Sequence, residues 1–395
     1  MSRISPARKI AFRVLAEVAE GAYASDALRE QSHSLDARDA GLAAQIVFGC
    51  LRYQGQLDYL VSLYAGRPIG RLDTVVAIAL RAGVFQLRYL ERIPVHAAVN
   101  ESVEFVKQSK RSAAGLVNAV LRKVNREPVR WPDEQTELSC PERLLARWRR
   151  HFGADQARAI AAAGLLEPAA YIRVRPGEEG ARGIFTERTQ VFAERTQIEG
   201  AWRLLGAAPV GTRLHDISSQ AIVPLLDLRA GQAYLDLCAA PGNKTVQAIE
   251  TPLSLAVACD VSERRLREVP PVCPRVVLDA TRALPFSRRF DRIFIDAPCS
   301  GTGTLARNPE IKWRVEPADF ARFAGLQTEI VAQALKVLAP DGKLLYATCS
   351  LEEEENEEVI RRTLKAETGL RVERKMWRLP GRDEGDGFYA AVLAR

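Results

Sequence analysis

The first third of the chain repeats its apolar residues at the spacing of an α-helix. Ser5 supplies a capping side chain and Pro6 suits a first helical position, so the two predict a helix start. The apolar residues that follow share one helical face until Gly21 ends the pattern. Comparable spacing predicts further helices over residues 39–64, 72–90, 97–107 and 113–124. Residues 1–128 are therefore predicted to form an all-helical domain.

The middle of the chain is patterned more weakly. Residues 127–137 are polar and broken by proline, which is typical of a linker. Residues 141–163 return to helical spacing, and residues 171–175 are typical of a strand. The stretch that follows is charged and has no clear period. We therefore predict a linker and a small α+β element over residues 129–209.

From about residue 210 onward, short apolar strands alternate with helical segments. Residues 293–295 form a continuous apolar run, which is the pattern of a parallel strand buried on both faces. Further strands begin at Ala233, Leu255, Arg275 and Lys343. Because strands that alternate with helices indicate a parallel sheet, residues 210–395 are predicted to form a Rossmann-like α/β domain.

Two of these strands end in a cysteine followed by a serine. Asp296, Cys299 and Ser300 follow one strand, and Cys349 and Ser350 follow another. In open α/β sheets, ligands bind at the carboxyl ends of the strands. A cysteine can also be a small apolar core residue, but packing does not explain the same ending on two neighbouring strands. We predict a reaction centre at this edge.

A third strand leads into a tight loop and a helix start, Asp236-Leu-Cys-Ala-Ala-Pro-Gly-Asn-Lys-Thr245. Such a loop directs backbone N–H groups at an anionic group, and it lacks the dinucleotide and triphosphate patterns. The next two strands end in Asp260 and Asp279, of which Asp260 is suited to both ribose hydroxyls. S-adenosylmethionine, with its carboxylate, ribose and adenine, suits these features. The expected cofactor-binding residues are Cys238, Ala239, Ala240, Pro241, Gly242, Asn243, Lys244, Asp260, Asp279 and Asp296.

Composition and charge indicate what the protein binds and in which compartment it works. The net charge is +7, and residues 1–130 hold all of that excess, with 19 Lys and Arg against 12 Asp and Glu. A polyanion-binding module explains this asymmetry, and so does an ordinary solvated helical surface. The seven cysteines include no Cys-x-x-Cys pair, which favours reduced thiols in a cytoplasm. The four histidines have no ligand spacing, and no apolar run is long enough for a membrane span, so we expect neither metal nor membrane.

The motifs together resemble the Nop/Sun family of RNA cytosine-C5 methyltransferases, and within it the bacterial branch that acts on small-subunit (16S) ribosomal RNA. The resemblance rests on the cofactor loop, on Asp296-Ala-Pro-Cys-Ser-Gly-Thr-Gly303, on Thr348-Cys-Ser350 and on a closing strand at Asp386-Gly-Phe-Tyr-Ala390. It extends to Arg307-Asn-Pro-Glu-Ile-Lys-Trp313. Upstream, residues 93–100 and 116–122 resemble the antitermination-factor-like (NusB-like) RNA-binding domain that precedes the catalytic domain in this branch.

The resemblance implies methyl transfer from S-adenosylmethionine to carbon 5 of a cytosine through a covalent cysteine adduct. It assigns attack on carbon 6 to Cys349 and release of the adduct to Cys299. Asp296 is expected to bind the pyrimidine edge, and Lys244 to lie beside cofactor and base. One departure is Asn243 where the family has a second glycine, and asparagine tolerates a positive φ. A second is a shortened helix after Asp260, which leaves the adenine wall undefined.

The same sequence features leave three other protein classes to consider. A transfer RNA methyltransferase, a DNA cytosine-C5 methyltransferase and a non-catalytic RNA-binding adaptor are the alternatives. Keeping both cysteines argues against the DNA enzyme, and the intact set Asp260, Asp279, Asp296, Cys299 and Cys349 argues against the adaptor. Lys312, Trp313 and Arg314 are expected to grip RNA, or Trp313 to be core. Ser350 and Glu353 form a capping-box pattern, and the acidic run 352–358 is given no catalytic role. We expect a cytoplasmic monomer.

Overall fold

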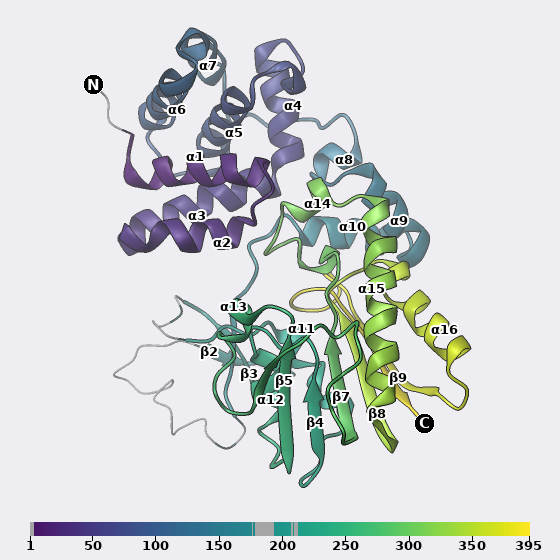
Figure 1. Cartoon of the computed structure of the whole chain (residues 1–395). Coiled ribbons are helices and arrows are strands. Elements are labelled where there is room, and N and C mark those ends of the chain that lie inside the picture. Colours follow the sequence, from purple (N-terminus) through teal and green to yellow (C-terminus); the bar gives the residue numbers. More distant parts are fainter. Residues whose placement is uncertain (1–3, 176, 178–192, 207, 209–211) are drawn as a thin grey trace. The chain divides into compact units, whose positions relative to one another are not determined.

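The computed structural model describes residues 4–175, 177, 193–206, 208 and 212–395 (Figure 1). Its internal contacts divide the chain into two compact units. The helical unit comprises Met1–Glu167 and Leu305–Arg314, and the sheet unit comprises Pro168–Thr304 and Val315–Arg395. This division differs from the boundaries predicted after residues 128 and 209, because the predicted linker and the helices after it belong with the N-terminal helices.

The helical unit is built from short amphipathic helices. The 3₁₀ turns η1 (Ser32–Ser34), η2 (Ile69–Arg71) and η3 (Arg111–Ala113) lie between them. Its α-helices are α1 (Pro6–Ala19), α2 (Ala24–Gln31), α3 (Ala37–Arg52), α4 (Gln54–Ala65), α5 (Thr74–Tyr89), α6 (Val95–Ser109), α7 (Ala114–Leu121), α8 (Glu134–Glu137), α9 (Glu142–Phe152), α10 (Ala154–Ala163) and α14 (Ile311–Arg314).

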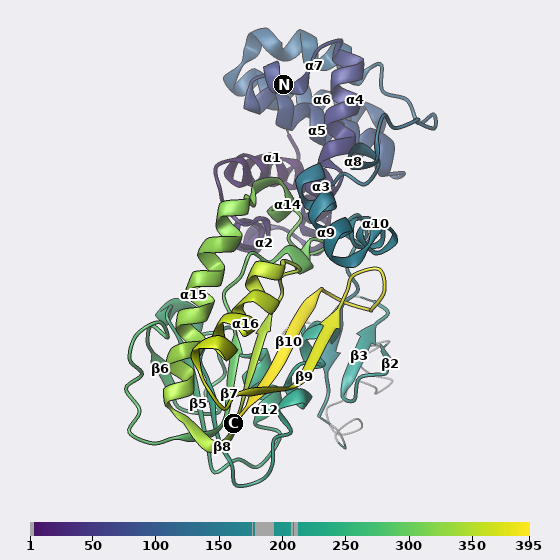
Figure 2. The same ribbon diagram turned by 90° about the vertical axis from the view of Figure 1, so that its right-hand side faces the viewer.

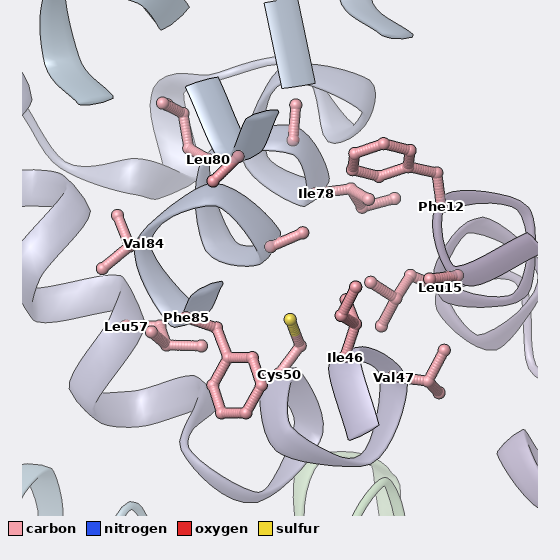
Figure 3. Packing of buried hydrophobic residues seen from close by; sticks show 14 of the residues in the cluster. Phe12, Leu15, Ile46, Val47, Cys50, Leu57, Ile78, Leu80, Val84 and Phe85 are labelled. Carbon is pink, nitrogen blue, oxygen red and sulfur yellow. The ribbon is translucent and has the colours of Figure 1, made fainter. Parts of the chain in front are cut away.

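Helix α5 forms the centre of this unit, because it is apolar on nearly every side. Figure 3 shows its Ile78 and Phe85 packed among side chains from α1, α3 and α4. A buried ion pair lies beside this core, with Arg8 Nη1 2.9 Å from Glu101 Oε1. Arg8 also donates to Gln86 of α5, so one guanidinium connects α1, α5 and α6.

The predicted helices are confirmed, with two breaks that the apolar spacing did not show. The pattern over residues 39–64 is two helices separated at Tyr53, which leaves the helical region with a ψ of 14°. The pattern over residues 141–163 is also two helices, separated at Gly153, whose φ of 87° is open to glycine and strained for other residues. Helix α2 was not predicted, because it buries only three residues.

Residues 305–314 leave the sheet unit and pack inside the helical unit. Lys312 is buried and donates to the carbonyl of Arg52, and Trp313 Nε1 donates to that of Leu51. Arg314 donates to carbonyls that follow α1. Cations are favourable at helix C-termini, where the last carbonyls lack intrahelical partners. These three side chains therefore anchor the segment. For the buried Lys312 the expectation of an RNA contact is wrong, whereas for the partly buried Trp313 and Arg314 it stays a prediction.

The sheet unit contains a seven-stranded mixed sheet in the order β6-β5-β4-β7-β8-β10-β9. The first five strands in that order are parallel, and β10 and β9 join antiparallel. The predicted parallel sheet is thus confirmed with an antiparallel edge. The strands are β4 (Ala233–Asp236), β5 (Leu255–Asp260), β6 (Arg275–Val277), β7 (Phe290–Asp296), β8 (Leu338–Thr348), β9 (Arg371–Arg378) and β10 (Phe388–Ala394).

Helices cover both faces of this sheet (Figure 2). Ile293 and Ile295 of β7 pack toward α15 and α16, whereas Phe294 packs on the opposite face with Ala248 of α12. Burial on both faces explains the continuous apolar run of this strand. The helical segments of the unit are α11 (Ile217–Gln220), η4 (Val223–Leu226), α12 (Asn243–Ala248), α13 (Glu263–Leu266), η5 (Thr302–Thr304), α15 (Pro317–Lys336), η6 (Glu353–Glu355) and α16 (Glu357–Ala366).

A small antiparallel sheet precedes the large one. Its strands are β1 (Tyr171–Arg173), β2 (Ala193–Arg195) and β3 (Ala201–Leu204), in the order β1-β3-β2. The strand predicted near Tyr171 is confirmed, while the rest of the predicted α+β element lies partly outside the described residues. Across the described ranges, no helix combines the length and apolar character that crossing a membrane requires.

Candidate active site

The two predicted cysteines meet at the carboxyl edge of the large sheet. Strands β7 and β8 are parallel neighbours, with Asp296 paired to Ala347. Because the chain turns just beyond this pair on both strands, Cys299 Sγ lies 3.3 Å from Cys349 Sγ. The hydrogen bond with Cys349 and burial both raise the pKa of Cys299 well above its usual range. Cys299 therefore keeps its proton at neutral pH.

Lys244 and Asp296 form an ion pair beside these sulfurs. Lys244 Nζ donates to Asp296 Oδ2 at 2.7 Å and lies 5.1 Å from the centre of the Phe388 ring. Burial works against the charged form of Lys244, but the charge and hydrogen bond of the Asp296 carboxylate outweigh it and raise the lysine pKa. Lys244 is therefore a positively charged ammonium at neutral pH.

A cavity of about 460 Å³ lies at the same edge. It is walled partly by apolar side chains, among them Leu278, Ala280 and Ile330. The carboxyl ends of β4, β5 and β7 and the loop after β6 all contribute to it. The predicted residues that line it are Cys238, Ala240, Asp260, Asp279, Asp296, Cys299 and Cys349.

The remaining predicted cofactor residues shape the loop between β4 and α12. Gly242 has a φ of 100°, and a Cβ there would lie 3.0 Å from Val269 Cα, so the turn requires glycine. Asn243 is the first residue of α12 and does not have a positive φ. The ability of asparagine to adopt a positive φ therefore does not explain its presence in the loop. Its side chain instead donates to Leu214 O and accepts from Arg213. Ala239, Pro241 and Asn243 are thus part of this loop but not of the cavity lining, and a cofactor contact for them stays a prediction.

Asp260 holds this loop against the end of β5. Its two carboxylate oxygens accept from Ala240 N at 3.2 Å and from Ser262 N at 2.9 Å. The carboxylate is buried, yet it belongs to the lining of the cavity. The shortened helix predicted after Asp260 is confirmed, because α13 has four residues. Leu278 and Ala280 supply the apolar wall that the sequence left undefined.

Asp236, at the end of β4, is buried and accepts from Thr245 Oγ1 at 2.7 Å. Burial raises the pKa of Asp236 to about 7. The hydrogen bond from Thr245 lowers this pKa, and the negative charge of Asp296 raises it further. An aspartate in the unfolded chain titrates near about 3.9. The folded state therefore binds this proton more tightly than the unfolded state does.

We expect Asp236→Asn to gain stability relative to the parent protein as the pH rises. The protonated Asp236 contributes to the free energy of unfolding, fully below about pH 4, and this contribution is lost as the pH rises through about 7. Asparagine does not ionise, so its contribution does not change with pH. The relative gain over that whole range should approach the order of 4 kcal/mol. Denaturant unfolding at pH 5 and pH 8 measures most of it, and a difference between the two proteins that stays constant with pH would contradict the prediction.

The sequence interpretation missed Glu355. Ser350 does not cap a helix together with Glu353, so the capping-box prediction is wrong. Glu355 is fully buried and accepts from Ser300 and Ser350, the residues that follow the two cysteines. A usable signal was present, since Leu351, Glu355 and Val359 recur at helical spacing and all three are buried.

A largely parallel sheet with an acid-lined cavity and two thiols at its carboxyl edge is the arrangement expected of a Rossmann-like methyltransferase. Residues 223–394 match the family model described as 16S rRNA methyltransferase RsmB/F, and residues 5–126 match the NusB family. Ribosomal RNA small subunit methyltransferase B of Erwinia tasmaniensis is 33% identical over 431 residues, covering 100% of both chains. That of Yersinia pestis is 33% identical over 424 residues, covering 98% of each. The chain belongs to the RsmB/F methyltransferase family.

Solved structures agree with the fold. The crystal structure of PH0851 is 21% identical, covers 100% of both chains and has a TM-score of 0.83. A methyltransferase homolog protein from Pyrococcus horikoshii is 23% identical, with a TM-score of 0.57 over 67% of this chain and 98% of that chain. These structures confirm the predicted fold class, and the family models and the curated relatives confirm the predicted family and enzyme class.

Proposed function

We propose that this protein transfers a methyl group from S-adenosylmethionine to carbon 5 of a cytosine in small-subunit ribosomal RNA. The observation that carries the proposal is the 3.3 Å approach of Cys299 and Cys349 at a cavity that Asp296 also lines. The curated relatives are named ribosomal RNA small subunit methyltransferases, which supports this choice of substrate. A cytoplasmic location and a monomeric state stay predictions.

The cavity fits S-adenosylmethionine. Its volume of about 460 Å³ suits a small-molecule site. We assign Asp260 and Asp279, which line it, to accept from ribose and adenine, and Leu278, Ala280 and Ile330 offer apolar surface. When bound, the cofactor supplies an electrophilic methyl group. The residues of this chain have to make a cytosine carbon nucleophilic enough to accept it.

We assign that task to Cys349. Addition of its thiolate forms a bond between Sγ and carbon 6 of the base, which makes carbon 5 nucleophilic. S-adenosylmethionine, held by cavity residues that include Asp260 and Asp279, would supply the methyl group to carbon 5 and would leave as the neutral thioether. The ammonium of Lys244 interacts electrostatically with Cys349, and a nearby cation stabilises a thiolate.

We assign release of the product to Cys299. Carbon 5 gives its proton to solvent water, the electron pair left behind restores the double bond of the ring, and the bond between carbon 6 and Cys349 Sγ breaks to expel the thiolate. Cys299 Sγ, 3.3 Å from Cys349 Sγ, is the neighbouring group suited to assist this step. Asp296 is assigned to the pyrimidine edge, and Lys244 fixes the orientation of its carboxylate through their 2.7 Å ion pair.

Transfer of a tritiated methyl group tests the proposed function. Purified protein with labelled S-adenosylmethionine should label small-subunit ribosomal RNA, and bisulfite sequencing should then find a protected cytosine. Transfer RNA and cytosine-containing DNA, offered separately, test the rival substrates. Labelling of either one in preference to ribosomal RNA would contradict the proposed substrate, and no labelling of any would favour the non-catalytic adaptor.

We expect the helical unit to supply phosphate contacts, so neutralising exposed basic residues there should flatten the salt dependence of RNA binding. Lys9 and Arg13 are exposed one turn apart on α1. Lys9→Gln/Arg13→Gln should reduce the slope of log affinity against log salt by up to about 2, roughly one unit for each lost phosphate contact. Deletion of residues 1–128 is a poorer test, because it removes the carbonyls that hold Lys312 and Trp313.

A matched control makes the same charge change in the sheet unit. Arg374 and Lys375 are exposed on β9, and Arg374→Gln/Lys375→Gln should leave the slope near that of the parent protein. Filter binding over a series of salt concentrations measures both variants. Equal slopes for the α1 variant and the parent would show that Lys9 and Arg13 are ordinary solvated residues.

A further inference from the structure

Glu355 is a buried carboxylate with a full set of hydrogen-bond donors. Its side chain lies on η6, six residues after Cys349, and is fully buried. Oε2 accepts from Ser300 N at 2.8 Å and from Gln327 Nε2 at 3.1 Å. Oε1 accepts from Ser350 Oγ at 2.7 Å and from Ser300 Oγ. An ionised carboxylate accepts about four hydrogen bonds, so these donors satisfy it.

These donors come mainly from the two turns that carry the cysteines. Ser300 follows Cys299, and Ser350 follows Cys349. The carboxylate of Glu355 therefore accepts a hydrogen bond from the neighbour of each cysteine. The two serine hydroxyls lie 3.1 Å apart. The third donor, Gln327 of α15, also donates to Pro298 O at 2.9 Å in the turn that carries Cys299. Glu355 is thus the common acceptor for the turns after β7 and β8 and for α15.

The cysteine turns leave separate strands, so the sheet register alone does not fix how far apart their sulfurs lie. Beyond the last ladder pairs, a backbone hydrogen bond from Gly303 N to Cys349 O at 2.8 Å joins the same two turns. Glu355 adds side-chain hydrogen bonds to that backbone link. The relative position of the two turns therefore depends on a side chain as well as on the backbone.

Because Glu355 is buried, the position of the two turns depends on the hydrogen-bond donors to its carboxylate. Burial raises the pKa of Glu355, while the donors from Ser300 and Ser350 act in the opposite direction. Burying a carboxylate is costly unless it is fully hydrogen-bonded, and removing its partners leaves the cost uncompensated. Loss of either serine hydroxyl should therefore weaken the hold of the carboxylate on the two turns.

We infer that Glu355 is a positioning residue that fixes the separation of Cys299 and Cys349 without touching either sulfur. This inference rests on the proposed function, in which the two cysteines act in sequence on one base. Displacing a reacting group by about 1 Å costs on the order of 100-fold in rate. Loss of Glu355 should therefore lower kcat for methyl transfer by roughly that factor. KM for RNA should change little, because Glu355 is fully buried.

Pairing of the two thiols gives a readout that needs neither RNA nor cofactor. Oxidised glutathione converts the two thiols to a disulfide and is itself reduced to two glutathione thiols, so electrons and protons balance. Mass spectrometry follows the rate of the Cys299–Cys349 disulfide. In Glu355→Ala this rate should fall by about tenfold or more, since the sulfurs are no longer held together. Glu355→Gln keeps the shape of the side chain and should recover most of both rates.

Two further variants serve as a charge-matched control and as a milder disruption of the same hydrogen bonds. Glu353→Ala removes the same charge from the same short helix at an exposed position, and it should match the parent in both assays. If Glu355→Ala does not fold, Ser350→Ala removes the 2.7 Å hydrogen bond and should show the same two losses in weaker form. Parent-like disulfide and methyl-transfer rates in Glu355→Ala would overturn the inference. Absence of methyl transfer in the parent protein would instead contradict the proposed function.

Discussion

Cys349→Ala should abolish methyl transfer, whereas Cys299→Ala should methylate RNA once and remain attached to it. In the proposed mechanism, attack on carbon 6 comes first, so no adduct should form without its nucleophile. Release comes last in that mechanism, so a protein that lacks the assisting group should stop with the carbon–sulfur bond intact. The 3.3 Å separation of the sulfurs places both groups where one base can meet them in turn.

Denaturing gel electrophoresis separates these outcomes. Cys299→Ala should give an RNA-shifted band that resists denaturant, and the double variant should give none. Cys299→Ser is a useful companion, because it keeps the shape of the side chain and removes the thiol. The arrangement of DNA cytosine-C5 methyltransferases predicts the reverse, so a stable adduct with Cys349→Ala and none with Cys299→Ala would overturn the assignment.

Asp260→Ala should weaken S-adenosylmethionine binding by about ten- to 100-fold while RNA affinity stays nearly unchanged. Hydrogen bonds to a charged group contribute about 1.5–3 kcal/mol, which corresponds to that range. The structure adds a second cause, since Asp260 also accepts from the backbone of Ala240 and Ser262. Titration calorimetry with the cofactor measures the loss.

Asp291→Ala is the matched control for this prediction. Asp291 also accepts from a backbone N–H, that of Ala233 at 2.7 Å, but it lies at the opposite end of the strands and outside the cavity lining. Its replacement should lower stability without the same loss of cofactor affinity. Unaltered cofactor affinity in Asp260→Ala would rule out the proposed place of the ribose.

Much of the site could be predicted because its signals are local. Apolar runs that end in Asp260, Asp296 and Cys349 indicated parallel strands and their carboxyl ends, and the structure brings these residues to one cavity. The interruptions at Tyr53 and Gly153 were missed, because apolar spacing continues across them while the backbone does not. The role of Asn243 was misjudged for a related reason, since a motif does not state which residue carries the positive φ.

The sequence by itself determined the order of helices and strands, the carboxyl-edge location of the acids and thiols, and the family, because these follow from side-chain periodicity and local turn chemistry. Only the tertiary structure decided which polar side chains are buried. Lys312 proved to be an anchor, and Glu355 the shared acceptor of two cysteine turns. The physical reason is that burial and hydrogen bonding join residues far apart in the chain. Ser300 and Glu355 are separated by 55 positions, and no local pattern records their contact.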